Sequence, residues 1–152
     1  MAETYQTTRR VEFRDTDAAG IMHFSAYIIY MEEVEHEFLR HIGLSVHHDE
    51  GETLMSWPRV SVHCDYRGPV RFEDMLEIDL SVSAMGTKSV AYQFDFSHQG
   101  RPIASGQTTA VCCRLETDKP PKSMPIPEWF RDKLLPYLVD DPDTFESSSD
   151  MK

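Results

Sequence analysis

The sequence contains only three cysteines, Cys64, Cys112 and Cys113, and no CxxC pair. An odd number without paired spacing argues against a disulfide framework and against a zinc site. No apolar run approaches the roughly 20 residues that a transmembrane helix requires. Residues 1–5 also lack the pattern that begins a signal peptide, so we expect a cytoplasmic protein.

The sequence also lacks the GxGxxG, Walker and GxSxG motifs of nucleotide-binding proteins and serine hydrolases. Residues 36–41 resemble the zinc motif HExxH, but His36 and His41 are five positions apart and point to different sides of a helix. We therefore expect no metal site. Basic residues are scarce as well, and the net charge of −11 disfavours nucleic acid as a partner.

The chain has 152 residues, of which 40% are hydrophobic, and this is enough for one domain with a single core. Residues 140–152 differ from the rest because acidic and serine residues dominate there and apolar residues are few. We predict one domain over residues 1–139 and a disordered, dispensable tail over residues 140–152.

Hydrophobic periodicity predicts one strand, one long helix and then about four long strands. The expected strands cover residues 4–14, 60–64, 76–82, 90–96 and 102–115, the long helix covers 24–43, a polar loop covers 45–56, and a short closing helix covers 127–135. This order is typical of an α+β domain whose antiparallel sheet packs one face against a single helix.

The helix over residues 24–43 has a wide apolar face and is expected to end at Gly43. The apolar positions that recur at helical spacing are Tyr27, Met31, Val34, Phe38 and Ile42. Ile28, Ile29 and Leu39 widen this face to more than half of the circumference. We therefore expect a curved sheet wrapped around the helix, and at least a dimer, because one small sheet covers so wide a face poorly.

Glu35 falls inside this apolar face, although an unpaired buried carboxylate is costly. We predict that it lies at the edge of the face or pairs with a basic group. The alternative is a second functional carboxylate, a role for which Glu32 is a lesser candidate. Cys112 and Cys113 are expected in mid-strand as buried thiols whose side chains point to opposite faces, which argues against a catalytic cysteine.

The most informative segment is residues 15–20, Asp-Thr-Asp-Ala-Ala-Gly, directly ahead of the long helix. The first turn of a helix has N–H groups without intrahelical partners, and these form an anion site. A carboxylate next to such donors can attack an acyl group while the donors stabilise the oxyanion. The alternative interpretation is a plain N-terminal cap, since Asp and Thr are good capping residues.

Together these features resemble the hotdog-fold acyl-CoA thioesterases, in the branch of 4-hydroxybenzoyl-CoA thioesterase and the Tol–Pal-associated thioesterases. The resemblance covers about residues 5–127 and is most specific over residues 11–24, with Tyr27 and the helix that follows. Weaker support comes from Pro69, Asp74, Lys88-Ser89 and Pro125-Ile126-Pro127. It implies hydrolysis of an acyl-CoA thioester, without a metal or organic cofactor, by a homodimer or homotetramer.

The resemblance also implies roles for particular residues. Asp17 corresponds to the catalytic carboxylate, the Phe24 backbone N–H to the oxyanion donor, and His23 to a variable aromatic position. Gly20, Tyr27 and Lys88 are the corresponding substrate-binding candidates. The other basic residues that could meet the CoA phosphates are Arg59, Arg67, Arg71, Arg101, Arg114, Lys119 and Lys122.

Two other functions remain open. A hotdog hydratase or dehydratase would use His23 with Asp17 to move a proton next to the thioester. A non-catalytic acyl-CoA-binding module would need neither Asp17 nor Gly20. The sequence leaves open the acyl group, the choice between dimer and tetramer, and whether Asp17 acts as a nucleophile or as a general base.

Overall fold

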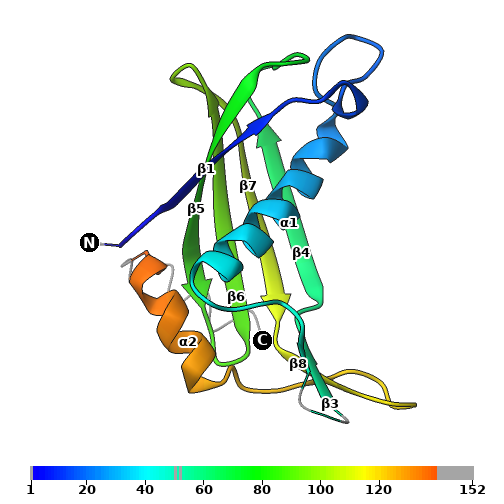
Figure 1. Ribbon diagram of the computed structural model, residues 1–152, viewed down its shortest axis with the longest axis vertical. Coiled ribbons are helices and arrows are strands. Elements are labelled where there is room, and N and C mark those ends of the chain that lie inside the picture. The colour runs from blue at the N-terminus through cyan, green and yellow to red at the C-terminus, as the bar shows by residue number, and fades with distance from the viewer. Residues whose placement is uncertain (1, 50, 52, 140–152) are drawn as a thin grey trace.

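The computed structural model describes residues 2–49, 51 and 53–139, so the predicted tail over 140–152 lies outside the described residues. Its main elements form one antiparallel sheet and one long helix (Figure 1). The sheet has the order β1-β5-β6-β7-β4, with β1 at Tyr5–Arg10, β5 at Met75–Met85, β6 at Ser89–His98, β7 at Arg101–Val111 and β4 at Arg59–Tyr66. The helix α1 covers Phe24–His41 and crosses one face of this sheet (Figure 1).

A second, smaller sheet lies at the opposite end of the molecule from the start of α1 (Figure 1). Its order is β2-β3-β8-β9, with β2 at His48–Asp49, β3 at Thr53–Ser56, β8 at Cys113–Glu116 and β9 at Lys122–Ser123. The remaining elements are the 3-10 helix η1 at Phe13–Asp15, the helix α2 at Glu128–Leu134 and the 3-10 helix η2 at Leu135–Tyr137.

The core lies between α1 and the concave face of the five-stranded sheet. On β5, alternate residues are fully buried, as the period of two predicts for a sheet with one covered face. On β7, Gly106 lets the helix approach closely, because an added Cβ would lie 2.5 Å from Met31 Sδ. The α+β prediction of a sheet packed against one long helix is therefore confirmed.

The long helix agrees with its prediction, and Gly43 follows its C-cap in the left-handed conformation, with φ of +83°. The closing helix is also confirmed, at Glu128–Leu134. The first strand is shorter than predicted. It ends at Arg10 because the Val11 N–H turns to bond the Asp74 carbonyl and the chain then enters η1.

Two other expectations were wrong. The polar loop predicted over residues 45–56 contains β2 and β3, which pair with each other, and β3 also pairs with the distant strand β8. The strand predicted over residues 102–115 breaks at Cys112, where the chain passes from one sheet to the other. Cys112 and Cys113 therefore do not lie in mid-strand, although both thiols are buried as expected.

Strand β4 forms one edge of the five-stranded sheet, so one side of its backbone has no strand partner among the described residues. Large apolar side chains are exposed along it, namely Val60, Val62 and Tyr66. Exposed apolar side chains on an unpaired edge favour pairing with another strand. Among the described residues, no helix is long and apolar enough to cross a bilayer.

Candidate active site

The loop between η1 and α1 holds Asp17 in a tight turn. The Gly20 N–H donates to the Asp17 carbonyl at 2.9 Å, and the Asp17 carboxylate Oδ1 accepts from the Ala19 N–H at 2.8 Å. Gly20 has a φ of +80°, a conformation that glycine adopts without strain, so its evident role is to close this turn. Asp17 stays half-buried at the surface rather than becoming part of the core.

Helix α1 begins immediately after this loop, and His23 caps it. The Ser25 N–H donates to His23 Nδ1 at 3.1 Å, so this nitrogen acts as an acceptor, and Ser25 Oγ lies 2.7 Å from the same nitrogen. The hydrogen bonds formed among the described residues include none from the Phe24 N–H. An unused N–H at the first turn of an 18-residue helix is a donor for an oxyanion.

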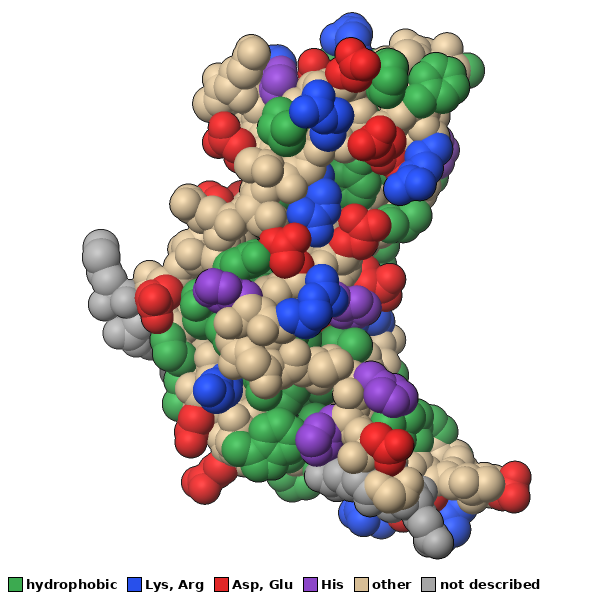
Figure 2. Space-filling model, viewed as in Figure 1, with side chains coloured by type: hydrophobic (Ala, Val, Ile, Leu, Met, Phe, Trp, Pro, Cys, Tyr) green, Lys and Arg blue, Asp and Glu red, His purple; other side chains and the backbone are tan. Residues whose placement is uncertain are grey.

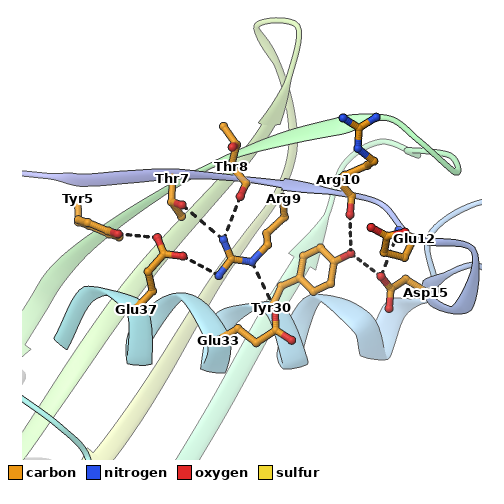
Figure 3. Close-up of polar contacts among 10 residues, drawn as sticks. All are labelled: Tyr5, Thr7, Thr8, Arg9, Arg10, Glu12, Asp15, Tyr30, Glu33 and Glu37. Carbon is orange, nitrogen blue, oxygen red and sulfur yellow. Dashed lines mark hydrogen bonds and ion pairs between the residues drawn. The ribbon is translucent and has the colours of Figure 1, made fainter. Parts of the chain in front are cut away.

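Asp15 connects the loop to α1 in two ways. Its carbonyl accepts from the His23 N–H at 2.7 Å, and its carboxylate Oδ2 accepts from the Tyr30 hydroxyl at 2.5 Å. The Tyr30 hydroxyl also donates to the Arg10 carbonyl at 3.3 Å (Figure 3). Burial and the neighbouring Asp15 raise the pKa of Tyr30 well above its usual value, so the phenol stays protonated as a donor.

Tyr27, a predicted substrate-binding residue, is only 3% exposed. Its ring packs edge-on against Tyr66 at 5.2 Å and against Phe96 at 5.3 Å. Burial raises its pKa to about 12. Tyr66 in turn donates its hydroxyl to the Phe24 carbonyl at 2.8 Å, so this aromatic group fixes the start of α1 against the end of β4.

Lys88 lies near the opposite end of strand β5 from the loop that holds Asp17. The loop that holds Asp17 adjoins the start of β5, whereas Lys88 follows the end of that strand (Figure 1). An 11-residue strand at about 3.3 Å per residue separates the two ends by roughly 33 Å. Lys88 instead lies near β9, where its Nζ is 3.4 Å from Ser123 Oγ.

A groove of ≈ 440 Å³ lies beside β8 and β9, close to Lys88. Its charged lining consists of Arg114, Glu116, Lys119 and Lys122. Three cations and one carboxylate give it a positive charge in a strongly acidic chain. By contrast, Lys, Arg, Asp and Glu side chains are interspersed over the face that carries β1 and α1 (Figure 2).

Glu35 pairs with a basic group, as predicted. Its side chain is buried, and its Oε2 lies 2.7 Å from Arg59 Nη2, while Oε1 has no partner among the described residues. Burial raises the pKa of Glu35 to about 7 against the opposing effect of Arg59. A bulge in β4 between Arg59 and Ser61 makes this pair possible, since it turns both Arg59 and Val62 toward the helix.

Within the described residues, no three histidine, cysteine, aspartate or glutamate side chains gather as metal ligands do. His36 and His41 lie on different sides of α1. The centre of the His41 ring lies 5.0 Å from that of Tyr5. The charges near the His36 ring are instead those of Glu32 and Arg59, and burial lowers the pKa of His36. The two histidines therefore lie on different sides of the helix, as their spacing predicts.

The comparison with known proteins adds the family. A model of the thioesterase-like superfamily matches residues 11–134. The chain belongs to the thioesterase-like superfamily. A 1,4-dihydroxy-2-naphthoyl-CoA hydrolase from Synechococcus elongatus is 32% identical over 133 residues, covering 86% of this chain and 94% of the relative. The acyl-CoA thioester hydrolase YbgC of Escherichia coli is 32% identical over 124 residues, covering 76% and 88% respectively.

Solved structures of this superfamily share the fold. A gentisyl-coenzyme A thioesterase is 31% identical with a TM-score of 0.71, and the match covers 87% of this chain and 99% of that one. A 1,4-dihydroxy-2-naphthoyl-CoA thioesterase from Synechocystis has a TM-score of 0.76 at 22% identity and covers 92% and 100%. These similarities confirm the hotdog fold expected from the sequence.

Sequence reasoning missed two residues of the candidate site. Tyr30 was hidden in the apolar pattern of α1, since a tyrosine at a core position looks like any other buried aromatic residue. Tyr66 lies 42 residues after the backbone carbonyl that it bonds. That contact depends on strand β4 lying beside the start of α1, and no local sequence pattern predicts this arrangement.

Proposed function

We propose that this protein hydrolyses acyl-CoA thioesters, with Asp17 as the catalytic carboxylate and the Phe24 N–H as the oxyanion donor. The observation that carries the proposal is the unused Phe24 N–H at the start of α1, directly after the turn that holds Asp17. Membership of the thioesterase-like superfamily supports the same chemistry.

The thioester carbonyl would lie at the start of α1, where the Phe24 N–H and the helix dipole stabilise negative charge on its oxygen. Asp17 then attacks the carbonyl carbon to give a mixed anhydride and release the CoA thiolate, and water hydrolyses the anhydride. In the alternative route, Asp17 removes a proton from a water molecule that attacks the carbonyl directly. Both routes give a free acid and CoA without a cofactor.

We also propose that the protein belongs to the branch of 4-hydroxybenzoyl-CoA thioesterase and the Tol–Pal-associated thioesterases, and we take its substrate class from that branch. Two relatives that are each 32% identical are named a 1,4-dihydroxy-2-naphthoyl-CoA hydrolase and an acyl-CoA thioester hydrolase. These names support aromatic acyl-CoAs within a wider range of acyl-CoA substrates. A gentisyl-coenzyme A thioesterase at 31% identity adds a second aromatic acyl group. Aromatic acyl-CoAs therefore come first in a substrate panel, followed by short-chain and long-chain ones.

We also propose a homodimer in which two copies of β4 pair edge to edge. Antiparallel pairing places the Arg59 end of one copy beside the Tyr66 end of the other. It therefore brings the basic groove of one copy toward the Asp17 loop of the other. This supports a shared site, because within one chain Lys88 and Asp17 are separated by the length of β5. Two such dimers could form a tetramer.

The decisive experiment measures free-thiol release from the acyl-CoA panel by the wild-type protein and by Asp17→Asn. We expect turnover of at least one aromatic acyl-CoA, and none by the variant. Formation of a hydrated or dehydrated acyl-CoA without thiol release would instead establish the rival lyase activity. Binding without turnover would establish a carrier.

Dialysis against a chelator is expected to leave the rate unchanged, and a loss restored by zinc would contradict this mechanism.

Light scattering at low micromolar concentration tests the dimer. We expect Val62→Lys, which places a charge on the β4 edge, to give monomers with little activity, while Gln6→Lys at an exposed position on β1 serves as a control at the opposite edge of the sheet. A fully active wild-type monomer would contradict the shared site.

A cytoplasmic location is proposed as well, because all three cysteines are free thiols, as is usual in a reducing compartment.

A further inference from the structure

Two tyrosine–carboxylate hydrogen bonds of the same kind join the helix α1 to the part of the chain that precedes it (Figure 3). Near the C-terminal end of α1, the Tyr5 hydroxyl donates to Glu37 Oε2 at 2.5 Å. Nearer its N-terminal end, the Tyr30 hydroxyl donates to Asp15 Oδ2, also at 2.5 Å. Glu37 belongs to the helix, so its bond with Tyr5 holds α1 against β1. Asp15 belongs to the loop ahead of the helix, so its bond with Tyr30 holds that loop against α1.

Asp15 attaches the loop to helix α1 and to the residue that caps it. Its carboxylate Oδ2 accepts from the Tyr30 hydroxyl and from the Glu12 N–H, the latter at 3.3 Å. Its carbonyl accepts from the N–H of His23, the residue directly before Phe24. The bonds of the Asp17 side chain, by contrast, stay within its own turn and do not fix the direction in which that turn faces.

Tyr30 supplies the rigid end of this attachment. It lies six residues after Phe24 on the same helix, and its ring is only 5% exposed. Because an α-helix rises about 1.5 Å per residue, the backbone of Tyr30 lies about 9 Å along the axis from that of Phe24. The loop is thus tied to α1 at two separate points, His23 and Tyr30, and two points restrain its orientation where one would leave it free to swing.

We propose that Tyr30 and Asp15 are positioning residues that set the placement of the Asp17 carboxylate relative to the Phe24 N–H. This inference rests on the proposed hydrolysis at the same site. Neither residue needs to touch the substrate. A displacement of about 1 Å between a catalytic group and its reacting partner can cost about 100-fold in rate, so a loosened loop would reduce turnover while leaving the CoA contacts in place.

The test compares Tyr30→Phe with Tyr5→Phe, since each variant removes one tyrosine–carboxylate hydrogen bond and keeps the ring. With an acyl-CoA that the wild type hydrolyses, we expect Tyr30→Phe to lower kcat about 10- to 100-fold with KM within about twofold of wild type. Tyr5→Phe is expected to retain wild-type kcat although it loses the same kind of bond. Equal kcat losses in both variants, or an unchanged kcat in Tyr30→Phe, would overturn the proposal.

Two further variants test the link through Asp15. Asp15→Asn keeps an oxygen that can accept from Tyr30, so we expect it to retain more activity than Asp15→Ala. Adding Tyr30→Phe to Asp15→Ala should then lower kcat no further, because the bond is already absent. Independent and multiplying losses would show that the two residues act separately and would contradict a shared positioning role.

Amide hydrogen exchange separates this inference from the proposed function, because it needs no substrate. We expect Tyr30→Phe to speed exchange at the amides of residues 15–23 at least tenfold, with little change at residues 33–40, and we expect Tyr5→Phe to leave residues 15–23 unchanged. If the wild type hydrolyses no acyl-CoA but this exchange pattern holds, only the proposed function fails. If hydrolysis occurs but the loop amides are unaffected, only the positioning role fails.

Discussion

Asp17 and Glu35 are two carboxylates that the same helix places in opposite environments. Asp17 precedes α1 in a surface turn, and its Oδ1 accepts from the N–H groups of residues two and four positions ahead. Glu35 lies in the middle of α1, is 1% exposed, and bonds Arg59, which is 24 residues away in sequence. A carboxylate held by its local backbone stays at the surface, whereas one held by a distant strand becomes part of the core.

The difference appears in the electrostatics of the two regions. At the start of α1, the free N–H and the helix dipole favour an anion. At Glu35, burial disfavours the anion and raises its pKa to about 7, although Arg59 lowers it again in part. A buried ion pair of this kind contributes little net stability, but removal of one partner is strongly destabilising.

The largest expected effect concerns Asp17, the proposed catalytic carboxylate. Asp17→Asn should lower the hydrolysis rate by about 1000-fold or more while the protein stays folded, because an amide is a poor nucleophile and a poor base. Asp15→Asn should be milder, since its amide oxygen can still accept from Tyr30. Steady-state kinetics with free-thiol detection measure both, and circular dichroism checks folding. An inactive Asp15→Asn beside an active Asp17→Asn would show that the roles are reversed.

The next effect concerns the buried pair. Arg59→Met should destabilise the protein by about 3–5 kcal/mol at pH 8, because it leaves the Glu35 anion buried without its partner. The loss should be smaller at pH 5, where Glu35 is protonated. Urea denaturation at the two pH values measures it, with the exposed Arg101→Met as a control expected within about 0.5 kcal/mol of wild type. Equal losses at both pH values would contradict the assigned role.

The pH dependence of stability gives a smaller effect of known sign. Glu35 has a pKa of about 7 in the folded protein against 4.5 for an ordinary glutamate, so between these values the folded state binds a proton that the unfolded state lacks. Its contribution to the unfolding free energy is therefore present below pH 4.5 and is lost as the pH rises through 7, by about 3 kcal/mol.

Glu35→Gln removes that titration. The difference in unfolding free energy between the wild type and Glu35→Gln should therefore fall from pH 4.5 to about pH 7 and level off above it. Denaturation series at intervals of half a pH unit would measure the difference, and the subtraction removes the contribution of groups such as Glu37, whose pKa is lowered and whose effect has the opposite sign. A difference that is flat across this range would show that Glu35 does not titrate there.

The smallest effect is expected from residues 140–152, which lie outside the described residues. Their acidic and polar composition predicts that truncation after Val139 changes neither stability nor turnover appreciably. Thermal unfolding and the thiol-release assay would measure both properties on the truncated chain. A fall of many degrees in the melting temperature would show that this segment packs against the domain.

The sequence by itself determined the features that depend on neighbours within one or two turns of chain. The periodicity of residues 24–43 predicted α1, and Gly43 predicted its end. The order Asp17 to Gly20 followed by a helix predicted a turn with a carboxylate beside unpaired N–H groups, and the chain forms that turn. These predictions succeed because hydrogen bonds between near neighbours are encoded by residue type and spacing alone.

Only the tertiary structure decided which distant residues meet. Glu35 carries no local sign that its partner is Arg59 rather than another cation, because a bulge in β4 turns Arg59 inward. Tyr30 looks like an ordinary core residue until the chain before α1 folds back and places Asp15 against its hydroxyl. The family resemblance gives both Lys88 and Asp17 a role at one substrate site, yet the two residues lie near opposite ends of strand β5. Such contacts depend on sheet register and chain direction, which no single segment encodes.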